Sequence, residues 1–146
     1  MNILERLAEG ISTVSAEETR ALAAELGRCL PADTTLALHG NLGVGKTTFV
    51  QGLAAGLGID ESVTSPTFNI FTLHRGSSRT LIHLDAYRLD RPEQVEDLML
   101  DDFLVSPWVL AVEWPERVAD WVPAEAWHIE LQIEGPQRHR MRLRRP

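Results

Sequence analysis

The sequence has one cysteine, one lysine and no long apolar run. The single cysteine, Cys29, excludes an internal disulfide, and its place at the end of a predicted helix favours a packing role. No apolar run approaches the roughly 20 residues that a membrane-spanning helix needs. The first ten residues include Glu5, Arg6 and Glu9, unlike the apolar centre of a secretory signal. These absences predict a cytoplasmic protein with no membrane partner.

The scarcity of lysine makes the one that is present informative. Lysine and arginine together number 14, and Lys46 is the only lysine among them. A bias toward arginine explains the other basic residues, whereas a lysine suits a phosphate contact as a compact, movable charge. GTPases that read guanine through the motif [NT]-K-x-D are excluded, because that motif would need a second lysine.

A surplus of acid also excludes a function class. The net charge is −7 at pH 7, which argues against a protein that coats nucleic acid, since such proteins normally present a basic surface. The arginines at 138, 140, 142, 144 and 145 have two interpretations. They form either an RNA or partner contact, or an exposed strand face paired with Glu130 and Glu134.

The length of 146 residues, with 44% hydrophobic and 24% charged residues, predicts one domain over residues 1–146. Apolar segments at 34–39, 67–74, 79–84 and 108–113 predict strands, and 46–57 predicts an amphipathic helix. Ser15 and Glu18 form a capping box for a helix that ends near Cys29. Short helices are expected at 92–98 and 116–121. The pattern indicates an α/β fold, a P-loop NTPase-like three-layer sandwich with a central mixed sheet flanked by helices.

A C-terminal β-hairpin is predicted from alternating residues at 128–134 and 138–144, with the turn near Gly135 and Pro136. In the expected register Glu134, Gln132 and Glu130 face Arg138, Arg140 and Arg142. Opposite charges at such positions stabilise a sheet by roughly 0.2–1 kcal/mol each.

A phosphate-binding loop is the strongest motif in the chain. Residues 40–47 match G-x-x-x-x-G-K-[ST] at every position, as Gly40-Asn41-Leu42-Gly43-Val44-Gly45-Lys46-Thr47. Glycines let backbone N–H groups turn toward phosphate oxygens, and the following helix presents its positive end to the same anion. Lys46 is expected to reach the β- and γ-phosphates, and the Thr47 hydroxyl to bind Mg²⁺. The predicted ligand is therefore ATP with Mg²⁺.

Two acidic residues follow apolar strands. Asp85 follows the strand that ends at Leu84, and Glu113 ends the strand that begins at Trp108. Carboxyl ends of strands are where α/β proteins place ligands, so either acid is a candidate for holding the metal or orienting water. Each is equally compatible with a solvated acid at a strand end, and spacing does not say which would bind the metal directly.

Beyond the P-loop, the chain resembles the bacterial TsaE (YjeE) family, the ATPase component of the machinery that makes threonylcarbamoyladenosine in tRNA. The resemblance rests on an ordered set of motifs: Ser15-Ala16-Glu17-Glu18-Thr19, the P-loop with Thr48, Ser65-Pro66-Thr67-Phe68, His83-Leu84-Asp85-Ala86-Tyr87-Arg88-Leu89 and Glu113-Trp114-Pro115-Glu116. The chain departs from the family at Asn41, Phe68 and Met99, where Asp, Tyr and Gly are common.

The resemblance implies roles for these residues. Thr47, Asp85 and Glu113 look like the magnesium ligands, and Lys46, Asp85, Glu113 and Thr67 like the catalytic set, with Thr67 in a switch-type loop. Nucleotide contacts are implied for Ser15, the P-loop through Thr48, Trp114 and Arg138. The implied partners are TsaD and TsaB proteins, which transfer the group themselves and hold the tRNA, so that hydrolysis by the isolated chain would be slow.

Two other functions remain open at this stage. A small-molecule or nucleoside kinase is the main alternative, although no clear arginine-bearing lid is visible between Gly58 and Asp102. A non-catalytic nucleotide sensor is the other, against which the two strand-end acids argue.

Overall fold

Seven strands form one mixed sheet in the computed structural model, which describes residues 1–41, 43–61, 63 and 70–146. The strands are β1 Ile11–Thr13, β2 Thr34–His39, β3 Phe71–Arg75, β4 Thr80–Asp85, β5 Trp108–Glu113, β6 Trp127–Gly135 and β7 Arg138–Arg144. Their order across the sheet is β1-β7-β6-β2-β5-β4-β3. The strands predicted at 34–39 and 108–113 are confirmed to the residue.

The centre of the sheet is parallel. β2 pairs in parallel with both β5 and β6, and β4 pairs in parallel with β5. The outer pairs, β3 with β4, β6 with β7 and β1 with β7, are antiparallel. The carboxyl ends of β2, β4 and β5 therefore meet at one edge of the sheet, where the P-loop begins.

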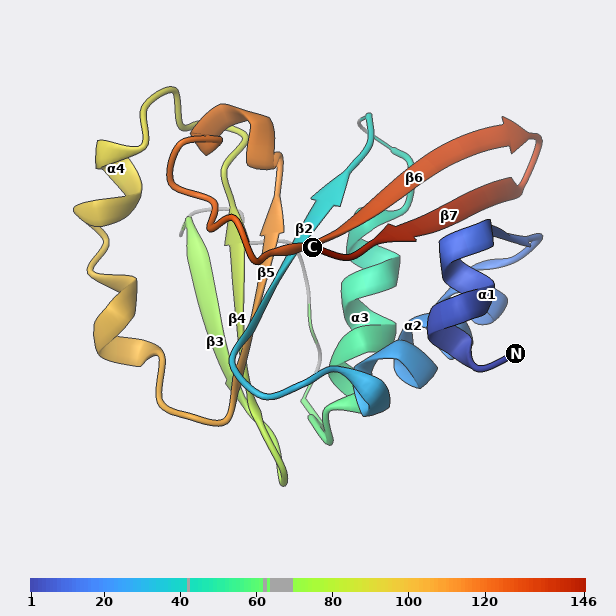
Figure 1. Cartoon of the computed structure of the whole chain (residues 1–146), viewed down its shortest axis with the longest axis horizontal. Coiled ribbons are helices and arrows are strands. Elements are labelled where there is room, and N and C mark those ends of the chain that lie inside the picture. The colour runs from blue at the N-terminus through green and yellow to red at the C-terminus, as the bar shows by residue number, and fades with distance from the viewer. Residues whose placement is uncertain (42, 62, 64–69) are drawn as a thin grey trace.

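Helices cover both faces of the sheet (Figure 1). They are α1 Ile3–Glu9, α2 Ala16–Cys29, α3 Lys46–Gly56, α4 Glu93–Glu96 and the 3₁₀ turns η1 Leu100–Phe103 and η2 Pro115–Val118. One hydrophobic cluster joins α1, α2 and α3 to one face, with Leu26, Leu36 and Phe49 fully buried. A second cluster joins α4, η1 and η2 to the other face. This confirms the predicted three-layer α/β class.

The long helices follow from their sequence. Ser15 caps α2 by accepting a hydrogen bond from Glu18 N at 3.1 Å, and the Glu18 carboxylate accepts one from Val14 N at 3.3 Å. Such a cap contributes about 1 kcal/mol. α3 lies close against α2, because a methyl group placed on Gly52 would stand 2.3 Å from the Arg20 carbonyl oxygen. The helix that carries Lys46 is thereby fixed against a long, capped neighbour.

Several elements differ from the sequence-based expectation. α4 spans four residues, shorter than the expected 92–98, and a 3₁₀ turn at 115–118 stands where a helix at 116–121 was expected. β3 begins at Phe71, and the expected strand residues 67–69 lie outside the described residues. α1 and β1 were not predicted, because seven and three residues are too few for a clear periodicity. The packing role expected for Cys29 is wrong, since the residue is exposed.

The hairpin register is confirmed for Glu130 with Arg142 and Gln132 with Arg140, but it shifts between Ile133 and Gly135, so that Arg138 pairs with Gly135 instead of Glu134. Two arginines of the hairpin also contact α1, which the strand register did not predict. Arg140 and Arg142 donate to the carbonyl oxygens of Glu9 and Ala8 at 2.9 and 3.2 Å, at the carboxyl end of α1. Positive charge is favourable there.

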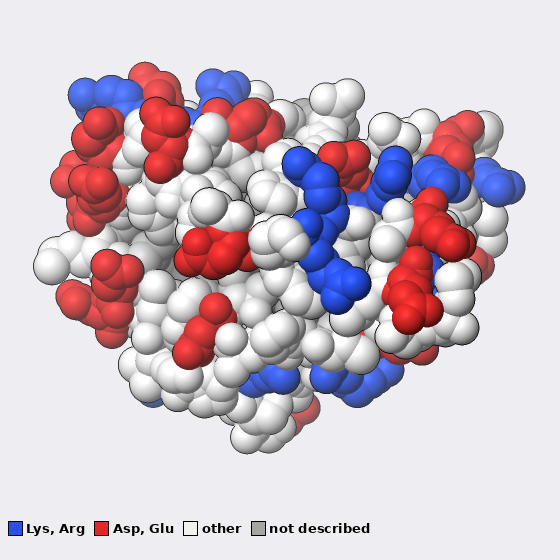
Figure 2. All heavy atoms as spheres, viewed as in Figure 1, with Lys and Arg blue, Asp and Glu red and all other residues white. Residues whose placement is uncertain are grey.

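Charge is unevenly distributed over the surface. Figure 2 shows acidic side chains gathered on the side where α4 lies, and basic ones mainly toward the hairpin. Exposed acids on that side include Glu93, Glu96, Asp97, Asp101 and Asp102. No helix in the described part of the chain is long and apolar enough to cross a membrane.

Candidate nucleotide site

The P-loop connects the end of β2 to the start of α3. Gly43 and Gly45 have φ values of 80° and 99°, in the left-handed region that favours glycine. Gly45 stands at the N-cap of α3 and makes no side-chain capping bond. The helix therefore begins with backbone N–H groups directed toward the loop, the arrangement that suits an anion.

Lys46 is buried beneath the loop, with 5% of its surface exposed. Its Nζ donates to the Gly40 carbonyl oxygen at 2.7 Å and lies 3.5 Å from the centroid of the Trp114 ring. Burial lowers the pKa of Lys46, and the nearby carboxylates of Glu113 and Asp85 act in the opposite direction. The only lysine thus lies in the loop with an aromatic ring over its charge.

Asp85 and Glu113 are register partners on the parallel strands β4 and β5. Asp85 Oδ1 accepts a hydrogen bond from Tyr87 N at 3.0 Å. Burial raises the pKa of Asp85, and the negative charge of Glu113 raises it further, although the Tyr87 hydrogen bond opposes this. The two strand-end acids that the sequence singled out therefore form a pair, which a cation would stabilise.

Glu113 is 4% exposed and His83 is fully buried. His83 Nε2 and Glu113 Oε2 are 2.5 Å apart. Sequence reasoning gave His83 no part in the nucleotide site. The available signal was its position two residues before Asp85, which places both on one strand face.

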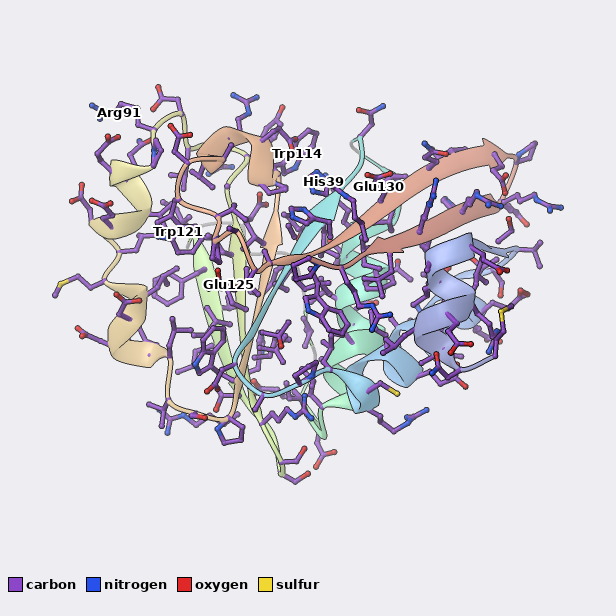
Figure 3. The ribbon with its side chains drawn as sticks, viewed as in Figure 1. His39, Arg91, Trp114, Trp121, Glu125 and Glu130 are labelled. Atoms are coloured by element: carbon purple, nitrogen blue, oxygen red, sulfur yellow. The ribbon has the colours of Figure 1, made fainter. Side chains whose placement is uncertain are left out.

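A cavity of about 300 Å³ brings the predicted residues together. Its lining comprises Gly43, Gly45, Lys46, Thr47, Thr48, Asp85, Tyr87, Glu113 and Trp114. Trp114 adopts a left-handed backbone with φ 58°, and its ring lies 5.0 Å from that of Tyr87. In Figure 3, Trp114 and His39 lie toward the same end of the sheet, where β5 and β2 terminate.

The donor set of this cavity suits magnesium. A threonine hydroxyl and two carboxylates are the oxygen ligands that Mg²⁺ accepts, and it commonly takes only one or two carboxylates beside phosphate and water. Within the described ranges, no group of three or more His, Cys, Asp or Glu residues is placed to hold a metal by itself. The residues fit a metal that arrives with a phosphate.

A second cavity of about 290 Å³ lies beside the first and shares Gly45 and Thr48 with it. Its other lining residues come from the start of α2, the P-loop and the hairpin: Val14, Ser15, Ala16, Thr19, Val44, Leu131, Gln137, His139 and Met141. Ser15, which the family resemblance implies as a nucleotide contact, is among these lining residues. The two cavities therefore adjoin each other at the start of α3.

Arg138 is not brought into either cavity. Its Nε is 3.4 Å from Glu134 Oε1, on the exposed surface of the hairpin. Its neighbours Gln137 and His139 line the second cavity instead, since alternation along the chain puts Arg138 on the face opposite to theirs. The inward alternation of His139 was the signal that could have identified it.

Gly40 and Asn41, both predicted as nucleotide contacts, line neither of these cavities. Asn41 is exposed and lines a separate hollow beside Ile133, while its carbonyl accepts from Val44 N at 3.2 Å. Leu42 and Thr67 lie outside the described residues, as does the expected switch-type loop at 65–67.

Comparison with known proteins points to one family. The family model described as threonylcarbamoyl adenosine biosynthesis protein TsaE matches residues 13–142. A Treponema pallidum protein named tRNA threonylcarbamoyladenosine biosynthesis protein TsaE is 40% identical over 119 residues, covering 82% of this chain and 87% of the relative. A Bacillus subtilis protein of the same name is 38% identical over 123 residues, covering 84% and 77%. The crystal structure of Bacillus subtilis YdiB superposes with a TM-score of 0.72 at 32% identity, covering 90% of this chain and 81% of that one.

Proposed function

The chain belongs to the TsaE family of threonylcarbamoyl adenosine biosynthesis proteins, and from this premise we propose that it binds and hydrolyses ATP within the machinery that makes threonylcarbamoyladenosine in tRNA. One observation carries the proposal. A single cavity gathers the P-loop lysine, Thr47 and both strand-end acids, and a second cavity of about 290 Å³ adjoins it.

In this proposal Thr47 and Asp85 would hold Mg²⁺ together with the phosphates of ATP, which leaves Glu113 for the attacking water. When bound, the metal neutralises charge on the β- and γ-phosphates. The P-loop N–H groups and the amino end of α3 hold the same phosphates. Glu113 orients the attacking water, and the Ser15 side of the second cavity receives the base.

Lys46 already has two contacts in the structure. Its ammonium uses one of its three N–H donors on Gly40 O and lies against Trp114, so a phosphate that bonds to the ammonium would compete with the ring for it. This arrangement supports slow turnover by the chain alone, with TsaD and TsaB proteins supplying the change that activates it. The tRNA is then held by those partners.

The test is threonylcarbamoyladenosine formation in a system reconstituted with TsaD, TsaB and this chain. Lys46→Ala and Asp85→Ala should each reduce product by at least about 100-fold, comparable to the loss of a preorganised charge contact in an active site. Arg91→Ala and Asp90→Ala are matched controls, because these charged side chains are 69% and 76% exposed, and both should retain activity. Product formation at the normal rate with either site variant would refute the proposal.

A further inference from the structure

Among the described residues, His83 is the one fully buried polar side chain beside the site to which the proposed function gives no role. It lies on β4, two residues before Asp85, with none of its surface exposed. Its chain neighbours Ile82 and Leu84 are also fully buried, so an apolar side chain would meet the packing requirement. A histidine there carries the cost of burying a polar ring, which calls for a compensating bond.

That bond is made to Glu113. A carboxylate only accepts hydrogen bonds, so the proton lies on His83 Nε2, which donates to Glu113 Oε2 across 2.5 Å. His83 Nδ1 is buried without a hydrogen-bond partner among the described residues. An unprotonated ring nitrogen tolerates this better than an N–H group does. Among the described residues, the ring therefore makes its hydrogen bond to one atom, Oε2 of Glu113.

The contact determines what Glu113 can offer the cavity. Oε2 is held from behind by the ring, while Glu113 also lines the cavity that contains Lys46 and Asp85. Among the described residues none is hydrogen-bonded to the other carboxylate oxygen, Oε1, so this is the oxygen that can serve a ligand there. A glutamate with one oxygen fixed loses freedom to rotate, and fixed geometry is what an orienting group needs.

We propose that His83 is a positioning residue that holds the Glu113 carboxylate so that Oε1 faces the reacting water. The inference rests on the proposed function, in which Glu113 orients that water. A positioning role of His83 differs from a purely structural link between β4 and β5. Loss of the positioning contact should lower the rate of turnover and leave nucleotide binding unchanged.

Two amide variants of similar polarity test the proposal. In His83→Gln the side-chain amide reaches the position of Nε2 and keeps the bond to Glu113, whereas in His83→Asn the amide ends near the position of Nδ1 and falls short. ATP hydrolysis is measured with the TsaD–TsaB complex present, with ADP affinity and unfolding midpoint recorded for each variant. His83→Leu, which buries no unpaired polar group, takes the place of the asparagine variant if that one does not fold.

We expect His83→Asn to lower kcat by about 10–100-fold, the usual cost of losing a partner that orients a site residue, with KM for ATP and ADP affinity within about threefold of normal. His83→Gln should stay within about threefold in kcat. Equal kcat in the two variants, or a loss confined to KM, would overturn the positioning role. Glu113→Gln distinguishes a failure of the proposed function from a failure of this inference. Unchanged turnover in Glu113→Gln refutes the role of Glu113 and, with it, the role of His83. Lost turnover in Glu113→Gln together with normal turnover in His83→Asn refutes only the role of His83.

Discussion

Lys46 and Trp114 are the two residues whose contact best reports the state of the site. The ammonium lies 3.5 Å from the ring centroid, well inside the range of a cation–π interaction. A phosphate that attracts the ammonium must weaken this contact. The indole environment should therefore change when nucleotide binds.

The intrinsic fluorescence of the four tryptophans provides a test at the residue scale. Titration with ATP and Mg²⁺ should change the emission, and Trp114→Phe should remove most of that change. Trp121→Phe is the control, because Trp121 lines neither cavity and lies apart from Trp114 in Figure 3. An undiminished change in Trp114→Phe would contradict the proposed contact between phosphate and Lys46.

The sequence predicts site residues best where a motif fixes both the residue types and the spacing between them. Lys46, Asp85 and Glu113 meet in one cavity because strand ends and a glycine loop position them without long-range detail. Arg138 entered the site only through the family resemblance, whereas the alternation of β7 already placed it on the face opposite His139. The sequence names His83 within a family motif and assigns it no role in the nucleotide site, because its contact with Glu113 joins two strands and cannot be read from spacing.

At the scale of elements, the α2–α3 pair supports the P-loop. Gly52 and Gly56 let the two helices approach so closely that methyl groups at these positions would stand 2.3 and 2.2 Å from the carbonyl oxygens of Arg20 and Ala24. Periodicity predicted both helices but not their close approach, since glycine within a helix usually indicates only a lower helix stability.

Gly52→Ala tests that packing, because the sign of the change in the free energy of unfolding depends on how closely the two helices approach. Helix propensity alone would stabilise the variant by about 1 kcal/mol. The close contact should instead destabilise it by about 1–3 kcal/mol, because backbone atoms of α2 must move. Urea unfolding measures the difference, and Ala55→Gly, at an exposed position of α3, provides the local cost of glycine. A stabilised Gly52→Ala variant would show that the helices are less closely packed than described.

The strands β2 and β6 carry a pair of stacked histidines beside the P-loop. His39 Nε2 and His128 Nδ1 are 2.8 Å apart, and His39 is visible close to Glu130 in Figure 3. Burial lowers the pKa of both rings; for His128 the charge of His39 lowers it further. Other charges act on the pair: Glu116 and Glu130 raise the pKa of His39, and Arg144 and Lys46 lower it.

This pair should make stability depend on pH. The pKa values in the folded chain lie below the unfolded value of about 6.5, so the unfolded chain binds more protons as pH falls through that value. The stabilisation is complete above pH 6.5 and decreases below it. Urea unfolding between pH 7.5 and 5.5 should show this loss, and His128→Asn, which keeps an amide near Nδ1 but cannot titrate, should reduce it. An identical pH slope in that variant would contradict the assignment.

For the molecule as a whole, charge determines how it can serve a tRNA pathway. The net charge is −7, and exposed acids gather over the α4 side. The hairpin arginines are largely engaged within the chain: Arg140 and Arg142 bind the end of α1, and Arg138 and Arg144 face Glu134 and Glu130. This favours the second interpretation of the arginine cluster, and it supports action through a protein partner.

ATP hydrolysis by the purified chain, alone and then with the TsaD–TsaB complex, tests the central claim most directly, with Lys46→Ala as the control. The account predicts slow hydrolysis by the chain alone, clear stimulation by the complex, and loss of that stimulation in Lys46→Ala. Tight ATP binding without any stimulation by the complex would contradict it.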